Sequence, residues 1–332
     1  MPSHCGVDII WRKMDKEDSG ASASDCRTFY DKENQCECLF NKTGPFWHMY
    51  TPGHITGILF TNEEELEFGM NLMGICADRS PKLKIYTFEL MNNHLHCILS
   101  GERKSCEDLF NRYKTRLQRY LAIQGRVVDM SAFSASLLRI ADLNALRSEI
   151  VYVNRNGYLV KSSYTPYSYL WGAGYLYFNP LYELLPTTAF NSLPLRDKRN
   201  ICRSRDVALS ARIRVANHMI LPSSYCSIKE GESFFRDAHH YFNLLSKNFE
   251  AYSEIAKRLK DAVFLSDEEM YSAVQAMCSK SYNLSKPALL PSAAKIDIAK
   301  KMRYDYNASN KQIQRILKID AAIIGSLFPK VM

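Results

Sequence analysis

The stretch KLKIYTFELMNNHLHCILSG, residues 82–101, has alternating, aromatic-rich and apolar segments on either side of two adjacent asparagines. Such segments are typical of strands, and Asn92-Asn93 favours a turn between them. Side chains two residues apart on a strand point to the same face. We therefore predict that His94 and His96 converge on one face, while Leu95 and Cys97 point into the core.

The two histidines allow two interpretations. Imidazoles one strand step apart on the same face can share a divalent metal ion. The alternative is a structural pair held by hydrogen bonds without a metal, and the pair taken alone favours this alternative.

The segments around this stretch alternate between strand and helix patterns. Two further strands are predicted at FWHMYT (46–51) and FSASLLRI (133–140). Three helices are predicted at NEEELEFGMNLMGICA (62–77), CEDLFNRYKTRLQRYLAIQ (106–124) and DLNALRSEIVYVNRNG (142–157). Thr61 and Glu64 have the spacing of a capping box for the first of these, and Asp142 is expected to cap the third. This order predicts an α+β fold in which helices cover one sheet.

The composition excludes some classes of protein. The chain has 332 residues, 46% of them hydrophobic, and a formal charge of +8. It is therefore expected to fold into more than one domain, and its charge suits a polyanionic partner or simply solubility. Because no run of about 18 apolar residues occurs and the start lacks a signal pattern, we expect neither a membrane span nor secretion. The ten scattered cysteines favour free thiols in a reducing cytoplasm.

We divide the chain into four regions. Residues 1–43 form a polar, irregular N-terminal extension, and residues 44–180 form the first folded domain. Residues 181–245 are a basic linker or helical region, in which the charges suit either solvent or DNA. Residues 246–332 form a helical domain.

The last of these regions has the spacing of a helix-turn-helix. Ser309 is expected to cap a short helix, Lys318 to Asp320 form a turn, and AAIIGSLF (321–328) forms a second helix. The pattern favours DNA binding, although other three-helix packs share it. The basic residues expected to contact DNA there are Lys311, Arg315 and Lys318.

A series of segments between residues 46 and 178 resembles, in order and with similar gaps, the motifs of the REP-associated tyrosine transposases. These enzymes belong to the HUH superfamily, which is named after a His–hydrophobic–His motif. The matching segments are WHM (47–49), LFTNEEE (59–65), MNNHLHCIL (91–99), FNRYKTRLQRYL (110–121), IVYVNRNGYLV (150–160) and TPYSYLWGAGYLY (165–177).

The resemblance implies a ferredoxin-like antiparallel sheet covered by helices, the HUH nuclease fold. It implies that His94, His96 and Asn156 hold Mg²⁺ or Mn²⁺ and that Tyr152 is the nucleophile. Residues four apart share a helix face, so Tyr152 and Asn156 can both face the histidines. The implied reaction nicks and rejoins single-stranded or hairpin DNA through a 5′-phosphotyrosine intermediate, as in DNA transposition and recombination.

The predicted DNA contacts also include the basic face of the helix 106–124, with Arg112, Lys114, Arg116 and Arg119 holding backbone phosphates. Tyr164, Tyr167, Tyr169 and Trp171 are candidates for stacking on bases, or for packing the end of the domain. The sequence leaves open whether the chain acts as a monomer or a homodimer.

Two alternatives to an active enzyme remain. Asn92 replaces the proline of the family's MPNH motif, Gly157 replaces the proline after Asn156, and GRVVDMSAF (125–133) lacks an arginine of the family. These departures suit a domesticated, non-catalytic, sequence-specific DNA-binding protein or repressor. An RNA-binding module is the third possibility, because a ferredoxin-like sheet with surface aromatics also binds RNA.

Overall fold

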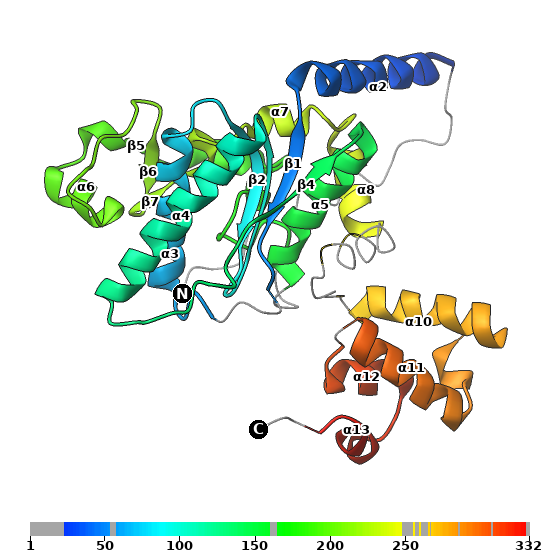
Figure 1. The fold of residues 1–332 in the computed structure, drawn as a ribbon. Helices are drawn as coiled ribbons and strands as arrows, with labels where there is room; N and C mark the ends of the chain where they lie inside the picture. Colours follow the sequence, from blue (N-terminus) through cyan, green and yellow to red (C-terminus); the bar gives the residue numbers. More distant parts are fainter. Residues whose placement is uncertain are drawn as a thin grey trace.

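The computed structural model describes residues 23–53, 58–159, 165–247, 255, 259, 265, 267–284, 286–306 and 308–329. It has an α+β fold with a small antiparallel sheet and many helices, as predicted (Figure 1). The sheet and the helices that cover it are β1 (Phe46–Tyr50), α3 (Glu63–Asp78), β2 (Lys84–Leu90), β3 (Leu95–Ser100), α4 (Arg103–Ile123), β4 (Ser136–Ile140) and α5 (Leu143–Leu159).

The four strands lie in the order β2-β3-β1-β4, and every neighbouring pair is antiparallel. His96 on β3 is opposite Tyr50 on β1 and Glu89 on β2. Directly opposite residues share a face of the sheet, so these three side chains form a row.

The two faces of the sheet are covered by different helices. Helices α3 and α4 lie on one side of the strands and α5 lies on the other (Figure 1). On the α3 side, a Cβ added at Gly69 would lie 3.0 Å from Leu90. Leu95 and Cys97 are at most 1% exposed, which confirms that they point into the core.

Helix α3 begins one residue later than predicted. Its N-cap is Asn62, whose side chain accepts a hydrogen bond from the Glu65 amide (2.9 Å). The Glu65 carboxylate accepts from the amide of Thr61 (2.6 Å) and from Arg126 (2.6 Å). The prediction of Thr61 and Glu64 as the capping pair is therefore wrong, because Asn62 and Glu65, one residue later, make these contacts.

Residues 23–43, which we expected to be irregular, form helix α2 (Ala23–Thr43). Its Glu33 carboxylate accepts hydrogen bonds from the Arg147 guanidinium on α5 (2.6 and 3.1 Å), and Phe40 stacks on Phe46 of β1 (4.9 Å between ring centroids). These tertiary contacts stabilise a helix whose own sequence has only a weak apolar stripe.

The chain after α5 folds back onto the sheet domain. Its elements are η1 (Gly174–Leu176), η2 (Pro180–Leu184), β5 (Thr188–Ala189), η3 (Phe190–Ser192), α6 (Leu195–Cys202), β6 (Arg214–Ala216), β7 (Met219–Ile220), η4 (Pro222–Ser224), α7 (Ile228–Glu232) and α8 (Ala238–Lys247). Strands β5, β6 and β7 form a second sheet, which we did not predict. Asn71 of α3 contacts β7, the last strand of this second sheet. The Asn71 side chain accepts a hydrogen bond from the Ile220 amide (2.7 Å) and donates one to the His218 carbonyl (3.2 Å).

The C-terminal helices are α10 (Asp267–Tyr282), η5 (Pro287–Leu289), α11 (Ser292–Asp305), α12 (Asn310–Leu317) and α13 (Ala321–Leu327). Ser309 caps α12 by accepting from the Gln312 amide (3.2 Å), and Asp320 caps α13 by accepting from the Ala322 amide (2.7 Å). Between them Lys318 adopts a left-handed conformation (φ 53°). Two short helices joined by a tight turn are present as predicted.

Among the described helices, none combines the length and the apolar composition needed to cross a bilayer.

Candidate active site

The two histidines of the hairpin lie together on the face of the sheet that α5 covers. Their ring centroids are 5.1 Å apart and the rings are nearly perpendicular. His94 precedes the first residue of β3, and its Nδ1 is hydrogen-bonded to Asn93 Oδ1 (2.6 Å). Asn93 also donates to the Gly53 carbonyl (2.7 Å), so the loop after β1 braces this turn. The predicted convergence of His94 and His96 is confirmed.

A third histidine, which we did not assign to the site, is bonded to this pair. His48 on β1 contacts His96 through a hydrogen bond between His48 Nε2 and His96 Nδ1 (2.9 Å). The opposite nitrogen of His48, Nδ1, is 2.7 Å from the Glu149 carboxylate on α5. His48, His96 and Glu149 are at most 1% exposed, so these hydrogen bonds are shielded from solvent.

Tyr152 lies one helical turn after Glu149 and faces the same histidines. Its ring is edge-on to His96 with 5.5 Å between centroids, and 5.9 Å from the His48 ring. Asn156 follows four residues later on α5 and is also buried. The structure thus brings Tyr152 to the histidines within one chain, which is the arrangement that a cis active site requires.

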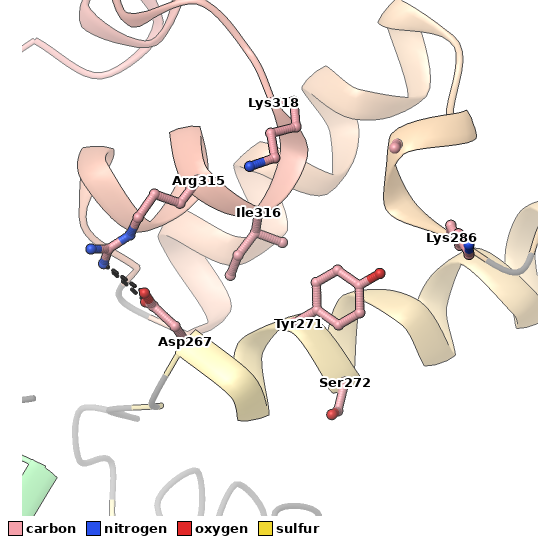
Figure 2. Close-up of a pocket in the computed structure, with 8 residues that line it drawn as sticks. Asp267, Tyr271, Ser272, Lys286, Arg315, Ile316 and Lys318 are labelled. Atoms are coloured by element: carbon pink, nitrogen blue, oxygen red, sulfur yellow. Dashed lines mark hydrogen bonds and ion pairs between the residues drawn. The ribbon is translucent and has the colours of Figure 1, made fainter.

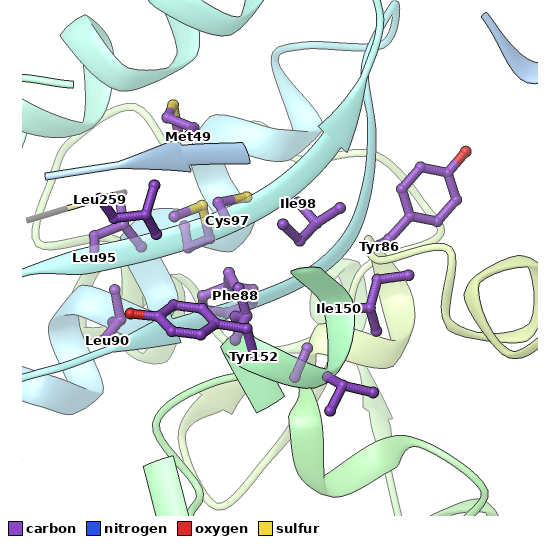
Figure 3. Close-up of a cluster of buried hydrophobic side chains, with 14 of the residues drawn as sticks. Met49, Tyr86, Phe88, Leu90, Leu95, Cys97, Ile98, Ile150, Tyr152 and Leu259 are labelled. Atoms are coloured by element: carbon purple, nitrogen blue, oxygen red, sulfur yellow. The ribbon is translucent and has the colours of Figure 1, made fainter. Parts of the chain in front are cut away.

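The candidate site is closed in this structure. Tyr152 is 1% exposed, His94 6% and Asn156 5%. Tyr152 belongs to the buried apolar cluster of the domain, in which Figure 3 also labels Ile150 of α5 and Leu259 from the C-terminal region. A DNA strand can reach the tyrosine only if part of this cover moves away.

A buried acid completes the row of side chains along this face. Glu89 is 1% exposed, and one carboxyl oxygen accepts a hydrogen bond from the Gly174 amide. Burial raises the pKa of Glu89 well above its usual value. A Cβ at Gly157 or at Gly174 would lie 2.7 Å from this carboxyl group, so the glycines leave the room that Glu89 occupies.

The side chains at this site offer the kinds of donor atom that the expected Mg²⁺ or Mn²⁺ accepts. Nδ1 of His94 is hydrogen-bonded to Asn93 and Nδ1 of His96 to His48, and Nε2 is the atom of each ring that would hold an ion. Within the described residues, no three His, Cys, Asp or Glu side chains lie together as a metal site. Asn156, which the resemblance implies as the third protein ligand, would offer an amide oxygen. Two imidazoles and an amide oxygen suit Mn²⁺, and Mg²⁺ when water completes the octahedron.

The basic residues of α4 lie away from this site. Helix α4 covers the other face of the sheet (Figure 1). Arg112 donates to the Arg79 carbonyl (3.0 Å), and Arg116 donates to the Cys202 carbonyl (3.3 Å). Both guanidinium groups therefore contact carbonyls of the protein itself. Arg119 is exposed and Lys114 is half-buried.

The basic residues of the C-terminal region, Lys311, Arg315 and Lys318, are all exposed. Arg315 and Lys318 line a pocket between α10 and α12, together with Tyr271 and Lys286 (Figure 2). Arg315 is paired with Asp267 on the pocket wall (2.8 Å). Arg315, Lys318 and Lys286 thus line one pocket, where Asp267 offsets part of their charge.

The remaining stacking candidates have mixed positions. Tyr169 is buried and its hydroxyl donates to the Leu90 carbonyl (2.6 Å), which gives it a structural role. Tyr167 is 38% exposed and Trp171 is half-buried. Tyr164 lies outside the described residues.

Sequence reasoning missed His48, Glu149 and Glu89 as members of the site. His48 had a usable signal, because strand alternation places it on the same face as Tyr50 in FWHMYT. Glu149 had one too, since it precedes Tyr152 by three residues and shares its helix face. Glu89 looked like an ordinary polar residue of an alternating strand.

Comparisons with protein-family models, with curated proteins and with solved structures find no match for this chain.

Proposed function

We propose that this chain is a metal-dependent transesterase of the HUH type that nicks and rejoins single-stranded DNA at hairpins or palindromic repeats. The observation that carries the proposal is the placement of Tyr152 edge-on to His96 (5.5 Å), with His94 beside His96 (5.1 Å). A pair of histidines with a purely structural role would not need a tyrosine on the facing helix packed against it.

The order of the elements supports the same proposal. The sheet domain has the β-α-β-β-α-β order of ferredoxin-like folds, with strands β2-β3-β1-β4. In the resembling enzymes a strand carries the histidine pair, and a later helix carries the nucleophilic tyrosine. Here β3 is a central strand and α5 follows β4.

In the proposed reaction the Tyr152 oxygen attacks the scissile phosphorus in line with the 3′ oxygen. The phosphorus–3′-oxygen bond breaks, the phenol loses its proton and the 3′ oxygen gains one. The 5′-phosphotyrosine bond keeps the phosphodiester energy, so a second 3′-hydroxyl can reverse the step and join new ends. Lewis-acid polarisation of a nonbridging phosphate oxygen is the chemistry that a divalent ion supplies when it is bound.

The protein contributes position and desolvation. His94, His96 and Asn156 would hold the ion, while helix α5 holds Tyr152 at a fixed distance from them. A phenol is a poor nucleophile at neutral pH, and burial disfavours its ionised form, so a bound cation or a base would have to ease loss of the Tyr152 proton. The α12–α13 unit and its cations Lys311, Arg315 and Lys318 are proposed to bind DNA outside this site.

The test is formation of a covalent adduct. Purified protein is incubated with Mn²⁺ and a library of labelled single-stranded hairpins, and adducts are separated on denaturing gels. We expect an adduct with the wild type and none with Tyr152→Phe. Tyr50→Phe is the matched control, because the Tyr50 ring also lies against His96 (6.4 Å) on the same face; it should keep the adduct.

Burial of Tyr152 at 1% exposure favours a second candidate, a non-catalytic DNA-binding protein that retains the fold. Tight hairpin binding with no adduct in any member of the library would establish this candidate and rule out the enzyme. An adduct that survives Tyr152→Phe would assign the nucleophile to another residue. A cytoplasmic location, and a monomeric or homodimeric state, remain predictions from the sequence.

A further inference from the structure

We propose that Glu149 and His48 are positioning residues that hold His96 in the tautomer whose Nε2 binds a metal ion. The inference rests on the proposed function of the histidine pair, and it adds two residues to that site. Its basis is the buried chain of hydrogen bonds from Glu149 through His48 to His96 (2.7 and 2.9 Å).

The proposed positions of the protons follow from one arrangement of these groups, in which Glu149 is a carboxylate and His48 is a neutral imidazole. A carboxylate only accepts hydrogen bonds, so Nδ1 of His48 donates to Glu149. A neutral imidazole has one donor and one acceptor nitrogen, so Nε2 of His48 accepts. The proton of the second hydrogen bond therefore belongs to Nδ1 of His96. The Nε2 of His96 then carries the lone pair that a metal ion needs.

The chain of hydrogen bonds from Glu149 through His48 to His96, which we call the relay, also fixes the orientation of the His96 ring. Metal-binding histidines usually donate their second N–H to a carboxylate, a carbonyl or water, which sets the tautomer and the ring orientation. Here another histidine takes that place and passes the effect to a carboxylate on α5. Because Tyr152 follows Glu149 by one turn, the same contact holds the tyrosine helix against the sheet.

A purely structural role is a poor explanation for this arrangement. Burying a carboxylate and two imidazoles removes them from water, and a packed apolar cluster of similar volume is often as stable or more stable. The strands supply such apolar residues on the other face of the same sheet, where Leu95 and Cys97 are fully buried. The polar chain is thus placed where the proposed chemistry requires a defined imidazole.

Two measurements on the full-length protein test the inference. The first is the tautomer of His96 by long-range ¹H–¹⁵N correlation in protein labelled with ¹⁵N-histidine. The second is Mn²⁺ affinity without DNA, from the free-ion signal in electron paramagnetic resonance. The variants are His48→Phe, which removes the acceptor, and Glu149→Gln, which removes the charge but keeps an oxygen acceptor.

The matched control is Thr87→Val. The Thr87 hydroxyl donates to the Asn154 side chain, which is another buried hydrogen bond between the sheet and α5. Loss of the Thr87–Asn154 hydrogen bond should lower the stability of the fold as the His48 and Glu149 variants do, but it should leave the hydrogen bonds of His96 unchanged. Thermal unfolding of each variant confirms that the measurements refer to folded protein.

We expect the wild type to show His96 protonated at Nδ1. His48→Phe should weaken Mn²⁺ binding by about 10–100-fold, the usual effect of losing a partner of a metal-binding histidine. Glu149→Gln should weaken it less, and Thr87→Val should leave both the tautomer and the affinity at wild-type values.

The other outcomes separate this inference from the proposed function. A wild-type His96 protonated at Nε2 overturns the relay, and this result needs no variant to fold. Mn²⁺ binding that is lost in His96→Ala but unchanged in both relay variants also overturns it, while the metal site stands. A wild type that binds no Mn²⁺, yet changes its His96 tautomer in His48→Phe, supports the relay and refutes the metal-dependent function.

Discussion

The two faces of the four-stranded sheet are built from alternate residues of the same strands, yet their chemistry differs. The face under α3 and α4 is apolar, whereas the face under α5 carries a row of buried polar groups. The apolar row includes Met49, Phe88, Leu90, Leu95, Cys97 and Leu99, and the polar row includes His48, Thr87, Glu89 and His96. Both rows are almost fully buried, so burial alone does not distinguish them.

The difference separates what stabilises the fold from what the proposed site requires. Apolar burial contributes roughly 25 cal/mol per Å² removed from water. Buried polar groups contribute little net free energy even when hydrogen-bonded, and they cost free energy when they are not. The apolar face is therefore expected to account for most of the stability, and the polar face for the chemistry.

The largest effect is expected on the apolar face. Leu99→Ala removes a fully buried side chain of β3 and leaves a cavity, which should lower the free energy of unfolding by about 2–5 kcal/mol. Denaturant titration measures this loss, and Mn²⁺ affinity of the folded fraction should stay at the wild-type value. A change in stability below about 0.5 kcal/mol would contradict the assignment of this face as the main core.

A pH-dependent effect is expected from Glu89 on the polar face. Its pKa is raised by burial, so the folded chain keeps a proton that the unfolded chain releases at ordinary carboxyl values. Stability should therefore fall as the pH rises above the ordinary carboxyl pKa, by about 1.4 kcal/mol per pH unit, until the pKa of the folded state is reached. The glutamine in Glu89→Gln does not titrate, so this variant should lack the contribution of Glu89 to the pH dependence of stability.

The measurement is denaturant unfolding of both proteins at pH 5 and pH 7. The wild type should lose stability relative to Glu89→Gln over this range. An equal pH dependence in the two proteins would mean that Glu89 is ionised in the folded state, so that the polar face would hold a second buried carboxylate in addition to Glu149.

The glycines around Glu89 give a smaller and purely steric prediction. A Cβ at Gly172 would collide with the Phe88 carbonyl and with the Glu89 carboxyl group. Because the carbonyl belongs to β2 and cannot rotate away, Gly172→Ala should cost about 1–3 kcal/mol, as overpacked cores do. Gly125→Ala is a useful contrast, since nothing lies within 4 Å of a Cβ there and only its positive φ (74°) opposes the change. Thermal unfolding of both variants makes this comparison, which fails if Gly172→Ala is as stable as the wild type.

The apolar face was the easier one to predict from the sequence. Strand alternation and helical periodicity are local signals, and they correctly gave the four strands of the sheet and the helices α3, α4 and α5. The helix cap at Asn62 was misplaced by one residue, because Thr61 and Asn62 are adjacent cap formers followed by three glutamates, and either can start the helix. The second sheet was missed because its strands have only two or three residues, too few for a periodic pattern.

The polar face could be predicted only in part. His94, His96 and Tyr152 came from a local motif and a family resemblance, and the structure places them together. The chain of hydrogen bonds from Glu149 through His48 to His96 was not predicted. His48 lies in the WHM segment, but the resemblance assigned it no role, and Glu149 is 101 residues away from it and belongs to no assigned site. Such a pair becomes visible only when strand order and helix position are known.

The smallest effect is expected for Arg119, an exposed residue of α4, and it concerns the salt dependence of DNA affinity. If α4 held DNA backbone in the proposed reaction, Arg119→Gln would reduce the slope of log affinity against log salt by about 0.7 for single-stranded DNA. Because α4 covers the face away from Tyr152, we expect this slope to stay at its wild-type value (Figure 1). Lys318→Gln on the C-terminal surface, by contrast, should reduce it. A reduced slope in Arg119→Gln would mean that the bound strand crosses both faces of the sheet, and the division between a structural face and a chemical face would no longer hold.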